Sequence, residues 1–332
     1  MVMRTASRLG AVALLACSAC VGLGEVGAFV PPTVDEDPSL PQLSITVAGH
    51  TRRIHVETYG DAAKPPLLVL HGSLGDLRAL RVFSALADEW FVILWDQRGN
   101  GLSERITADE YTFDGVVAEI DAVRAAFAGD RRVSLLGHSF GAMYASLYLS
   151  RRHDSIDRVV LLEPGGLDGD IFSQTFADII VVDLWSDGLN EAFWSAETLS
   201  PGDHAQMDHA ALRILADGHQ TRYYCDPDAP PYYPVWRPGA YVEYLRGLRM
   251  SEHATGGATF AYDFAEGLRT VTTPVTIVAG ECSALGPAYQ ARHHVPLFGR
   301  AQVVAIPNAG HRLFVEQPAV VLEVVRRGLA GP

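Results

Sequence analysis

The chain contains 332 residues and carries a formal net charge of −13, with 48% hydrophobic and 20% charged residues. This length and composition predict a globular protein with a sizeable core, and they exclude a disordered chain. The excess of negative charge would repel a phosphate backbone, so the composition argues against nucleic-acid partners.

The N-terminus has the pattern of an export signal. Two arginines precede the apolar run 9–16, which is too short to span a bilayer as a mature helix. The run leads into Leu-Leu-Ala-Cys17, which resembles a bacterial lipobox. The resemblance implies an exported lipoprotein, periplasmic or on the cell surface, that is held at a membrane surface by lipid on Cys17. Plain secretion, with cleavage after Ala19 or Ala28, is the alternative, and residues 1–20 are the predicted signal peptide and lipobox.

From residue 43 onward, short β-branched runs alternate with longer helical patterns. The expected strands cover 44–47, 54–58, 66–71, 91–95, 132–136, 158–162, 275–279 and 301–306. The expected helices cover 79–88, 113–127, 140–151 and 318–329. This alternation predicts an α/β fold in which a mostly parallel, doubly wound sheet has helices on both faces.

The rhythm of strands and helices divides the chain into segments. Residues 21–42 are rich in proline and acidic residues, which predicts a linker. The core is expected over 43–168 and 257–332. Residues 169–256 contain helical pieces without that rhythm, and they predict an inserted, mainly helical cap. Such an insertion would lie over the carboxyl edge of the sheet, where ligands bind in folds of this kind.

Two cysteines, Cys225 and Cys282, lie within the predicted folded region. Because export leads to an oxidising compartment, a disulfide between them is permitted. The chain has no CxxC pair and no HExxH motif. We therefore expect no metal site and no cofactor.

The pattern Gly137-His138-Ser139-Phe140-Gly141 stands between an expected strand and an expected helix. A serine at so sharp a turn needs small neighbours, which the two glycines provide, and the helix N-terminus favours negative charge. Ser139 is therefore the predicted nucleophile.

At this point the chain resembles the α/β-hydrolase superfamily, over about residues 43–330. His71-Gly72-Ser73 ends a strand as the oxyanion loop of that family does, which implies that the amides of Ser73 and Phe140 stabilise the oxyanion. The sequence 96–103, DQRGNGLS, resembles the family's DxRGxGxS loop, in which Asp96 and Arg98 are expected to brace the surrounding loops.

The general base and its acid come from later in the chain. Asn308-Ala309-Gly310-His311 matches the family's NxGH loop, so His311 is the predicted base. The family usually carries the acid in a GxxD pattern after its seventh strand, where this chain has Gly280-Glu281-Cys282-Ser283 with serine in the place of the acid.

Several carboxylates are therefore candidates for the acid. Some members of the superfamily carry it at the end of the preceding strand, where this chain has Glu163 directly before a proline. A buried glutamate needs a partner, and His311 would provide one. Glu163 is the first candidate and Glu281 the second. A more distant acid such as Asp168, or a working dyad without an acid, stays open.

A serine nucleophile in this setting predicts a serine hydrolase that cleaves a carboxylic ester, or a related acyl bond, of a small apolar substrate through an acyl-enzyme. The inserted segment carries aromatic residues that would wall an acyl pocket or pack the cap, namely Tyr232, Tyr233, Trp236 and Tyr241.

Two alternatives remain open. DQRGNGLS and the cap also resemble the proline iminopeptidase branch, although that branch usually shows GGSWG where this chain has GHSFG. An aminopeptidase would need carboxylates that hold the substrate's amino group, and Glu243 or Glu252 are candidates. The second alternative is a non-catalytic hydrolase homologue that binds a ligand, which the missing acid at the usual position suggests.

Overall fold

The computed structural model describes residues 31–169, 171, 173, 202–216, 225, 235–254 and 261–331. The predicted signal peptide and lipobox at 1–20, with Cys17, lie outside these residues. Within the described residues, no helix combines the length and the apolar character that crossing a membrane requires.

A single eight-stranded sheet forms the centre of the fold, in the order β1-β2-β4-β3-β5-β6-β7-β8. The pairs β1–β2 and β2–β4 are antiparallel, and every later pair is parallel. The strands are β1 Gln42–Val47, β2 His50–Tyr59, β3 Pro66–Leu70, β4 Phe91–Trp95, β5 Val133–His138, β6 Ile156–Leu162, β7 Val275–Gly280 and β8 Ala301–Ile306. The mostly parallel sheet that the sequence predicts is confirmed.

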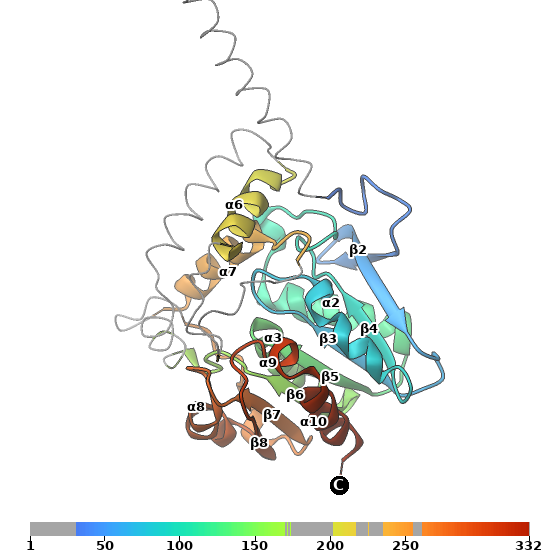
Figure 1. Ribbon diagram of the computed structural model, residues 1–332. Helices are drawn as coiled ribbons and strands as arrows, with labels where there is room; N and C mark the ends of the chain where they lie inside the picture. Colours follow the sequence, from blue (N-terminus) through green and yellow to red (C-terminus); the bar gives the residue numbers. More distant parts are fainter. Residues whose placement is uncertain are drawn as a thin grey trace, which may run out of the picture.

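Helices cover both faces of the sheet (Figure 1). On one face α2 (Phe113–Ala128) and α3 (Phe140–Arg152) pack on the strands, and on the other lie η2 (Leu77–Leu86), α9 (Leu313–Glu316) and α10 (Pro318–Ala330). The helix α8 (Pro287–His293) contacts β7 and β8. Short 3₁₀ turns are η3 Ala108–Glu110, η4 His153–Ser155, η6 Leu268–Thr270 and η7 Val295–Leu297. The fold is therefore doubly wound.

The central strands are apolar along their whole length because both of their faces are covered. Every residue of β3, β4 and β5 is buried. Burial of one large aliphatic side chain stabilises the fold by about 1.5–3 kcal/mol, so these strands are a main source of stability. They also fix the strand ends from which the site residues project.

The chain between β6 and β7, which we call the β6–β7 segment, contributes two described helices, α6 (Ala205–Ala216) and α7 (Ala240–Glu252). The two pack against each other and lie together in Figure 1, in yellow and orange. Apolar residues of α7, including Val242 and Leu245, join the same core cluster as α2 and α3. This part of the segment is thus packed against the core that α2 and α3 share.

The packed part of the chain begins earlier than the sequence predicts. Thr33 and Val34 fall in the predicted linker 21–42, yet both are buried. The amide of Val34 donates to the carbonyl of Leu102 at 2.8 Å. These two positions of the predicted linker are therefore packed against the rest of the chain.

Candidate active site

Ser139 lies in the sharp turn between β5 and α3. Its backbone has φ 55° and ψ −121°, a conformation that costs energy for any residue except glycine. A Cβ on Gly137 would lie 2.4 Å from the carbonyl oxygen of Gly141, and one on Gly141 would lie 2.2 Å from that of Leu70. The two glycines are therefore required for the turn, and the turn leaves the Ser139 side chain half-buried at the start of α3.

Glu163 and His311 meet at the carboxyl ends of the strands. Glu163 directly follows β6 and is completely buried, with φ 43°. His311 lies in the loop between β8 and α9, and its Nδ1 is 2.7 Å from Oε2 of Glu163. Because a carboxylate only accepts, the imidazole donates from Nδ1 and presents Nε2 on its other side.

Two more donors hold the Glu163 carboxylate. The amide of Gly280 donates to Oε1 at 2.6 Å, and the hydroxyl of Ser283 donates to Oε2 at 2.7 Å. With His311, these donors satisfy a buried carboxylate that would otherwise be very costly. Sequence reasoning placed Ser283 at the usual position of the acid but did not predict this contact.

The other candidate acids lie elsewhere. Glu281 is exposed, and its amide donates to the carbonyl of Ile306, which fixes the backbone in the sheet edge. Asp168 is half-buried farther along the chain that leaves β6. The carboxylate that the structure brings to His311 is that of Glu163.

The loop that carries His311 is braced from two sides. His138 donates from Nε2 to the carbonyl of His311 at 2.9 Å, and burial lowers the pKa of His138 well below its usual value. Glu316 accepts from the amide of Gly310 with both carboxylate oxygens at 3.1 Å. His138 is therefore a neutral donor that holds the backbone of His311, the predicted base.

The predicted oxyanion loop contacts the β6–β7 segment. The hydroxyl of Ser73 donates to Oε2 of Glu243 in α7, and that carboxylate also pairs with Arg246 one turn later. The guanidinium of Arg246 lies 4.2 Å from the ring centroid of Phe140. One helix of the segment thus touches both residues whose amides are the predicted oxyanion donors. No sequence signal pointed to Arg246.

Arg246 is fixed by a buried pair of tyrosines. Its Nε donates to the hydroxyl of Tyr144 at 2.7 Å, and Tyr144 is 2.7 Å from the hydroxyl of Tyr111. Burial raises the pKa of both tyrosines, so both stay neutral at physiological pH. The charge of Arg246 is thus balanced by Glu243 alone within this group.

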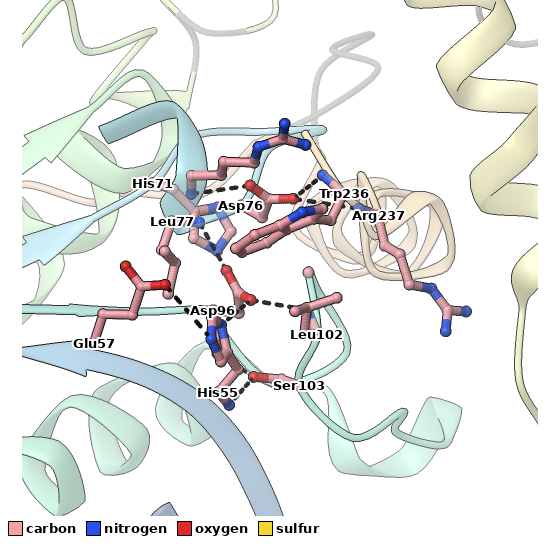
Figure 2. A network of polar contacts seen from close by, with 12 residues as sticks. His55, Glu57, His71, Asp76, Leu77, Asp96, Leu102, Ser103, Trp236 and Arg237 are labelled. Atoms are coloured by element: carbon pink, nitrogen blue, oxygen red, sulfur yellow. Dashed lines mark hydrogen bonds and ion pairs between the residues drawn. The ribbon is translucent and has the colours of Figure 1, made fainter. Parts of the chain in front are cut away.

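Asp96 holds several loops together through hydrogen bonds, as the DxRGxGxS pattern predicts (Figure 2). It accepts from the amides of Leu77 and Leu102 at 2.7 and 2.8 Å, and from His55 at 2.8 Å. A Cβ on Gly101 would lie 2.1 Å from the Asp96 carboxyl carbon, which explains the glycine. The other predicted brace, Arg98, binds Glu119 at 3.0 Å.

A second buried carboxylate, Asp76, docks the returning end of the β6–β7 segment. Figure 2 shows it facing Trp236 and Arg237, and it accepts hydrogen bonds from the backbone amides of both residues. Burial and the nearby charge of Asp96 raise the pKa of Asp76 well above its usual value. Trp236 is therefore part of this docking contact; its ring lies 5.5 Å from that of His55.

The other residues that the sequence predicts for the pocket or for binding an amino group differ in where they lie. Tyr241 stacks on His204 at 3.9 Å between centroids, which packs α7 against the chain before α6. Tyr232 and Tyr233 lie outside the described residues. Glu252 is exposed and pairs with Arg249 at 2.7 Å.

The disulfide that the sequence permits is present. Cys225 of the β6–β7 segment is bonded to Cys282, with 5.1 Å between the Cα atoms. The amide of Cys225 also donates to Glu316 at 3.3 Å, and the amide of Cys282 donates to Ala309 at 3.0 Å. The disulfide therefore joins the segment to the two loops that carry Ser283 and His311.

The chain is similar to hydrolases of several kinds. The chain is 28% identical over 284 residues to a proline iminopeptidase of Lactobacillus delbrueckii subsp. lactis, which covers 79% of this chain and 89% of that protein. A thermophilic esterase from Thermogutta terrifontis has a TM-score of 0.65 and 20% identity, and covers 87% of this chain and 98% of that one.

An enol-lactonase from Burkholderia xenovorans LB400 has a TM-score of 0.62 and 17% identity, and covers 87% of this chain and 100% of that one. At such identities the likeness to the esterase and the lactonase shows the fold alone. A family model for the alpha/beta hydrolase fold matches residues 65–318, most of the chain. With the sheet and the serine turn already in place, this match establishes that the chain belongs to the alpha/beta hydrolase family.

Proposed function

We propose that this protein is a serine hydrolase that cleaves a carboxylic ester of a small, apolar acyl substrate. Ser139 is the nucleophile, His311 the base and Glu163 the acid. The observation that carries the proposal is the 2.7 Å contact between His311 Nδ1 and the buried Glu163 carboxylate, at the strand edge where Ser139 sits in a strained turn.

The residues support a two-step mechanism. Ser139 Oγ attacks the ester carbonyl as its proton passes to Nε2 of His311, and the amides of Ser73 and Phe140 stabilise the oxyanion. The C–O bond then breaks, and the alcohol leaves with the proton from His311. Water, deprotonated by His311, hydrolyses the acyl-Ser139 ester. Throughout, Glu163 orients the imidazole and stabilises the imidazolium that forms.

An aminopeptidase is the second candidate, because the relatives include proline iminopeptidases and Glu243 lies next to the oxyanion loop. Such an enzyme must hold an ammonium group with carboxylates. Glu243 already faces Arg246, and Glu252 faces Arg249. A substrate ammonium would have to compete with a built-in guanidinium, so the charge distribution favours an uncharged acyl substrate.

Substrate panels separate these two candidates. We expect p-nitrophenyl esters of short acyl chains to be hydrolysed with a kcat/KM at least about 100-fold above that of prolyl and other aminoacyl anilides, which corresponds to roughly 3 kcal/mol in transition-state binding. The opposite ranking would establish the aminopeptidase.

A non-catalytic, ligand-binding homologue is the third candidate. A fluorophosphonate probe decides this point, because it labels only an activated serine. We expect labelling of the wild type and none of Ser139→Ala. An unlabelled wild type, together with equal ester hydrolysis by both proteins, would support the ligand-binding homologue.

We further propose that the protein is exported and held at a membrane surface by lipid on Cys17, with the β6–β7 segment as a cap over the site. The disulfide supports export, since such bonds persist in oxidising compartments. Labelling of growing cells with a palmitate analogue should mark the wild type and not Cys17→Ser. Equal labelling of both would refute the anchor.

A further inference from the structure

Ser283 and Glu163 project from neighbouring parallel strands toward the same point. β6 and β7 are paired so that Leu162 lies opposite Val278, and the amide of Glu163 donates to the carbonyl of Val278 at 3.0 Å. Glu163 follows β6 directly, and Ser283 lies in the turn that follows β7 at Gly280. The side chains from the two strand ends thus meet at the Glu163 carboxylate, which contacts the imidazole of His311.

The hydroxyl of Ser283 has a fixed direction. It accepts from the amide of Leu285 at 3.1 Å, so its single proton is left for Oε2 of Glu163 at 2.7 Å. The oxygen that receives this proton is the one that binds His311. Ser283 therefore shares an acceptor atom with the predicted base.

The turn that carries Ser283 is anchored at several points. The amide of Gly286 donates a hydrogen bond to the carbonyl of Ser283 at 3.0 Å. The amide of Cys282 donates a hydrogen bond to the carbonyl of Ala309, and its sulfur forms the disulfide with Cys225. A Cβ on Gly280 would lie 2.2 Å from the carbonyl oxygen of Ala309, so the turn lies tightly against the loop of His311. The position of the hydroxyl is set by the backbone.

From this geometry we propose that Ser283 is a positioning residue that holds the Glu163 carboxylate on His311, and that the imidazole can take its carboxylate from either strand end. The catalytic part of the proposal rests on the proposed function. Ser283 Oγ and His311 Nδ1 both lie 2.7 Å from Oε2 of Glu163. A carboxylate on the side chain of residue 283 would therefore extend into the place of that oxygen once residue 163 is shortened.

Four variants of the oxidised full chain test the proposal, with p-nitrophenyl acetate as substrate. Ser283→Ala should lower kcat by about 5- to 10-fold with little change in KM, the effect of one lost hydrogen bond of roughly 1 kcal/mol. Ser283→Thr keeps the hydroxyl and should retain nearly all activity. Glu163→Asn, which is shorter and suits the positive φ, should lower kcat by about 1,000-fold or more.

The decisive variant is Glu163→Asn combined with Ser283→Asp. We expect it to recover at least about 10-fold of the kcat lost in Glu163→Asn. The proposal is overturned if the double variant recovers none of the lost kcat, or if Ser283→Ala has the kcat of the wild type. Either result overturns it even if turnover depends on Ser139, as the proposed function requires.

Proton NMR provides a readout that does not need turnover. The proton on Nδ1 of His311 should resonate far downfield in the wild type and be assigned by its loss in His311→Gln. It should disappear in Glu163→Asn and return in the double variant. If it returns while no variant hydrolyses esters, the positioning role stands and the proposed function fails; if it does not return, the positioning role fails.

Discussion

Two glutamates near the candidate site each accept a hydrogen bond from a serine hydroxyl, yet their surroundings differ. Glu163 is fully buried at the end of β6, and its partners are Ser283, the Gly280 amide and His311. Glu243 lies in α7 with 19% of its side chain exposed, and it binds Ser73 and the guanidinium of Arg246.

The difference lies in how the two charges are balanced. Glu243 faces a permanent cation. Among the described residues, no arginine or lysine forms an ion pair with Glu163, whose only ionisable partner there is His311. Its negative charge is therefore matched when the imidazole becomes protonated, as the proposed role of His311 as general base requires in the transition state. One glutamate is arranged for a transient charge and the other for a permanent one.

The largest effect should come from neutralising the first of these glutamates. We expect Glu163→Gln to lower kcat by about 1,000-fold to 10,000-fold, because the imidazole loses its orientation and the stabilisation of its charge. Glu281→Gln and Glu243→Gln are the matched controls and should each lower kcat less than about 10-fold. Steady-state kinetics on an ester substrate check this ranking, and a larger loss in Glu281→Gln would reassign the acid.

Removing the permanent cation should mainly affect stability. Arg246 is buried and is the ionic partner of Glu243, so Arg246→Met leaves a carboxylate uncompensated and should cost about 3–5 kcal/mol in the free energy of unfolding. Arg327→Met is the control, because its pair with Glu323 is largely exposed and should contribute less than about 1 kcal/mol. Urea unfolding measures both, and equal losses would contradict the distinction.

The disulfide connects the two regions, since it ties the β6–β7 segment to the turn that carries Ser283. Its loop closes over a sequence separation of 57 residues. Replacing both Cys225 and Cys282 by serine should lower the unfolding free energy by about 2–4 kcal/mol, because the unfolded chain regains freedom. Denaturant unfolding under oxidising conditions checks the value. If dithiothreitol destabilises the double variant as much as the wild type, the effect does not come from this disulfide.

The local part of this arrangement was predictable from the sequence. Apolar runs locate the strands, the glycines around Ser139 mark the turn, and Glu163 before Pro164 marks a strand end. These are signals that neighbouring residues carry. The contacts of Ser73 with Glu243 and of Arg246 with Phe140 join residues far apart in the chain, so no local pattern encodes them.

The burial of Val34 within the predicted linker has a related explanation. A single apolar residue such as Val34 can dock a polar stretch only if a matching surface exists, and that surface is formed by other parts of the chain. The sequence did not predict the hydrogen bond from the Ser283 hydroxyl to Glu163, because Glu163 follows a different strand.

The smallest predicted effect concerns the chain that leaves Glu163. His294 accepts from the amide of Leu167 at 3.3 Å with Nε2 and donates from Nδ1 to Gln290 at 2.5 Å, an arrangement that needs a neutral ring. Burial lowers the pKa of His294 to about 3 from its usual 6.5. The unfolded chain therefore binds more protons between these values, and the stabilisation that is complete above pH 6.5 is lost as the pH falls toward 3.

Between pH 7.5 and pH 5, this one histidine should reduce the free energy of unfolding by about 2 kcal/mol. Urea titrations at several pH values give the free energy of unfolding as a function of pH. This free energy should fall less steeply toward acidic pH in His294→Gln than in the wild type. It should fall as steeply as in the wild type in His153→Gln, whose side chain is exposed. If the free energy of unfolding of His294→Gln depends on pH as strongly as that of the wild type, this histidine is not a source of acid sensitivity.

The most direct test of the central claim is the mass of the Ser139 peptide during turnover. A p-nitrophenyl ester reaction that is quenched with acid within milliseconds and digested should yield this peptide with the mass of the acyl group added. The same peptide from Glu163→Gln should carry little acyl group at equal times, because its acylation is slow. Ester hydrolysis with no acyl group on Ser139 at any time, or hydrolysis by Ser139→Ala at the wild-type rate, would contradict the account.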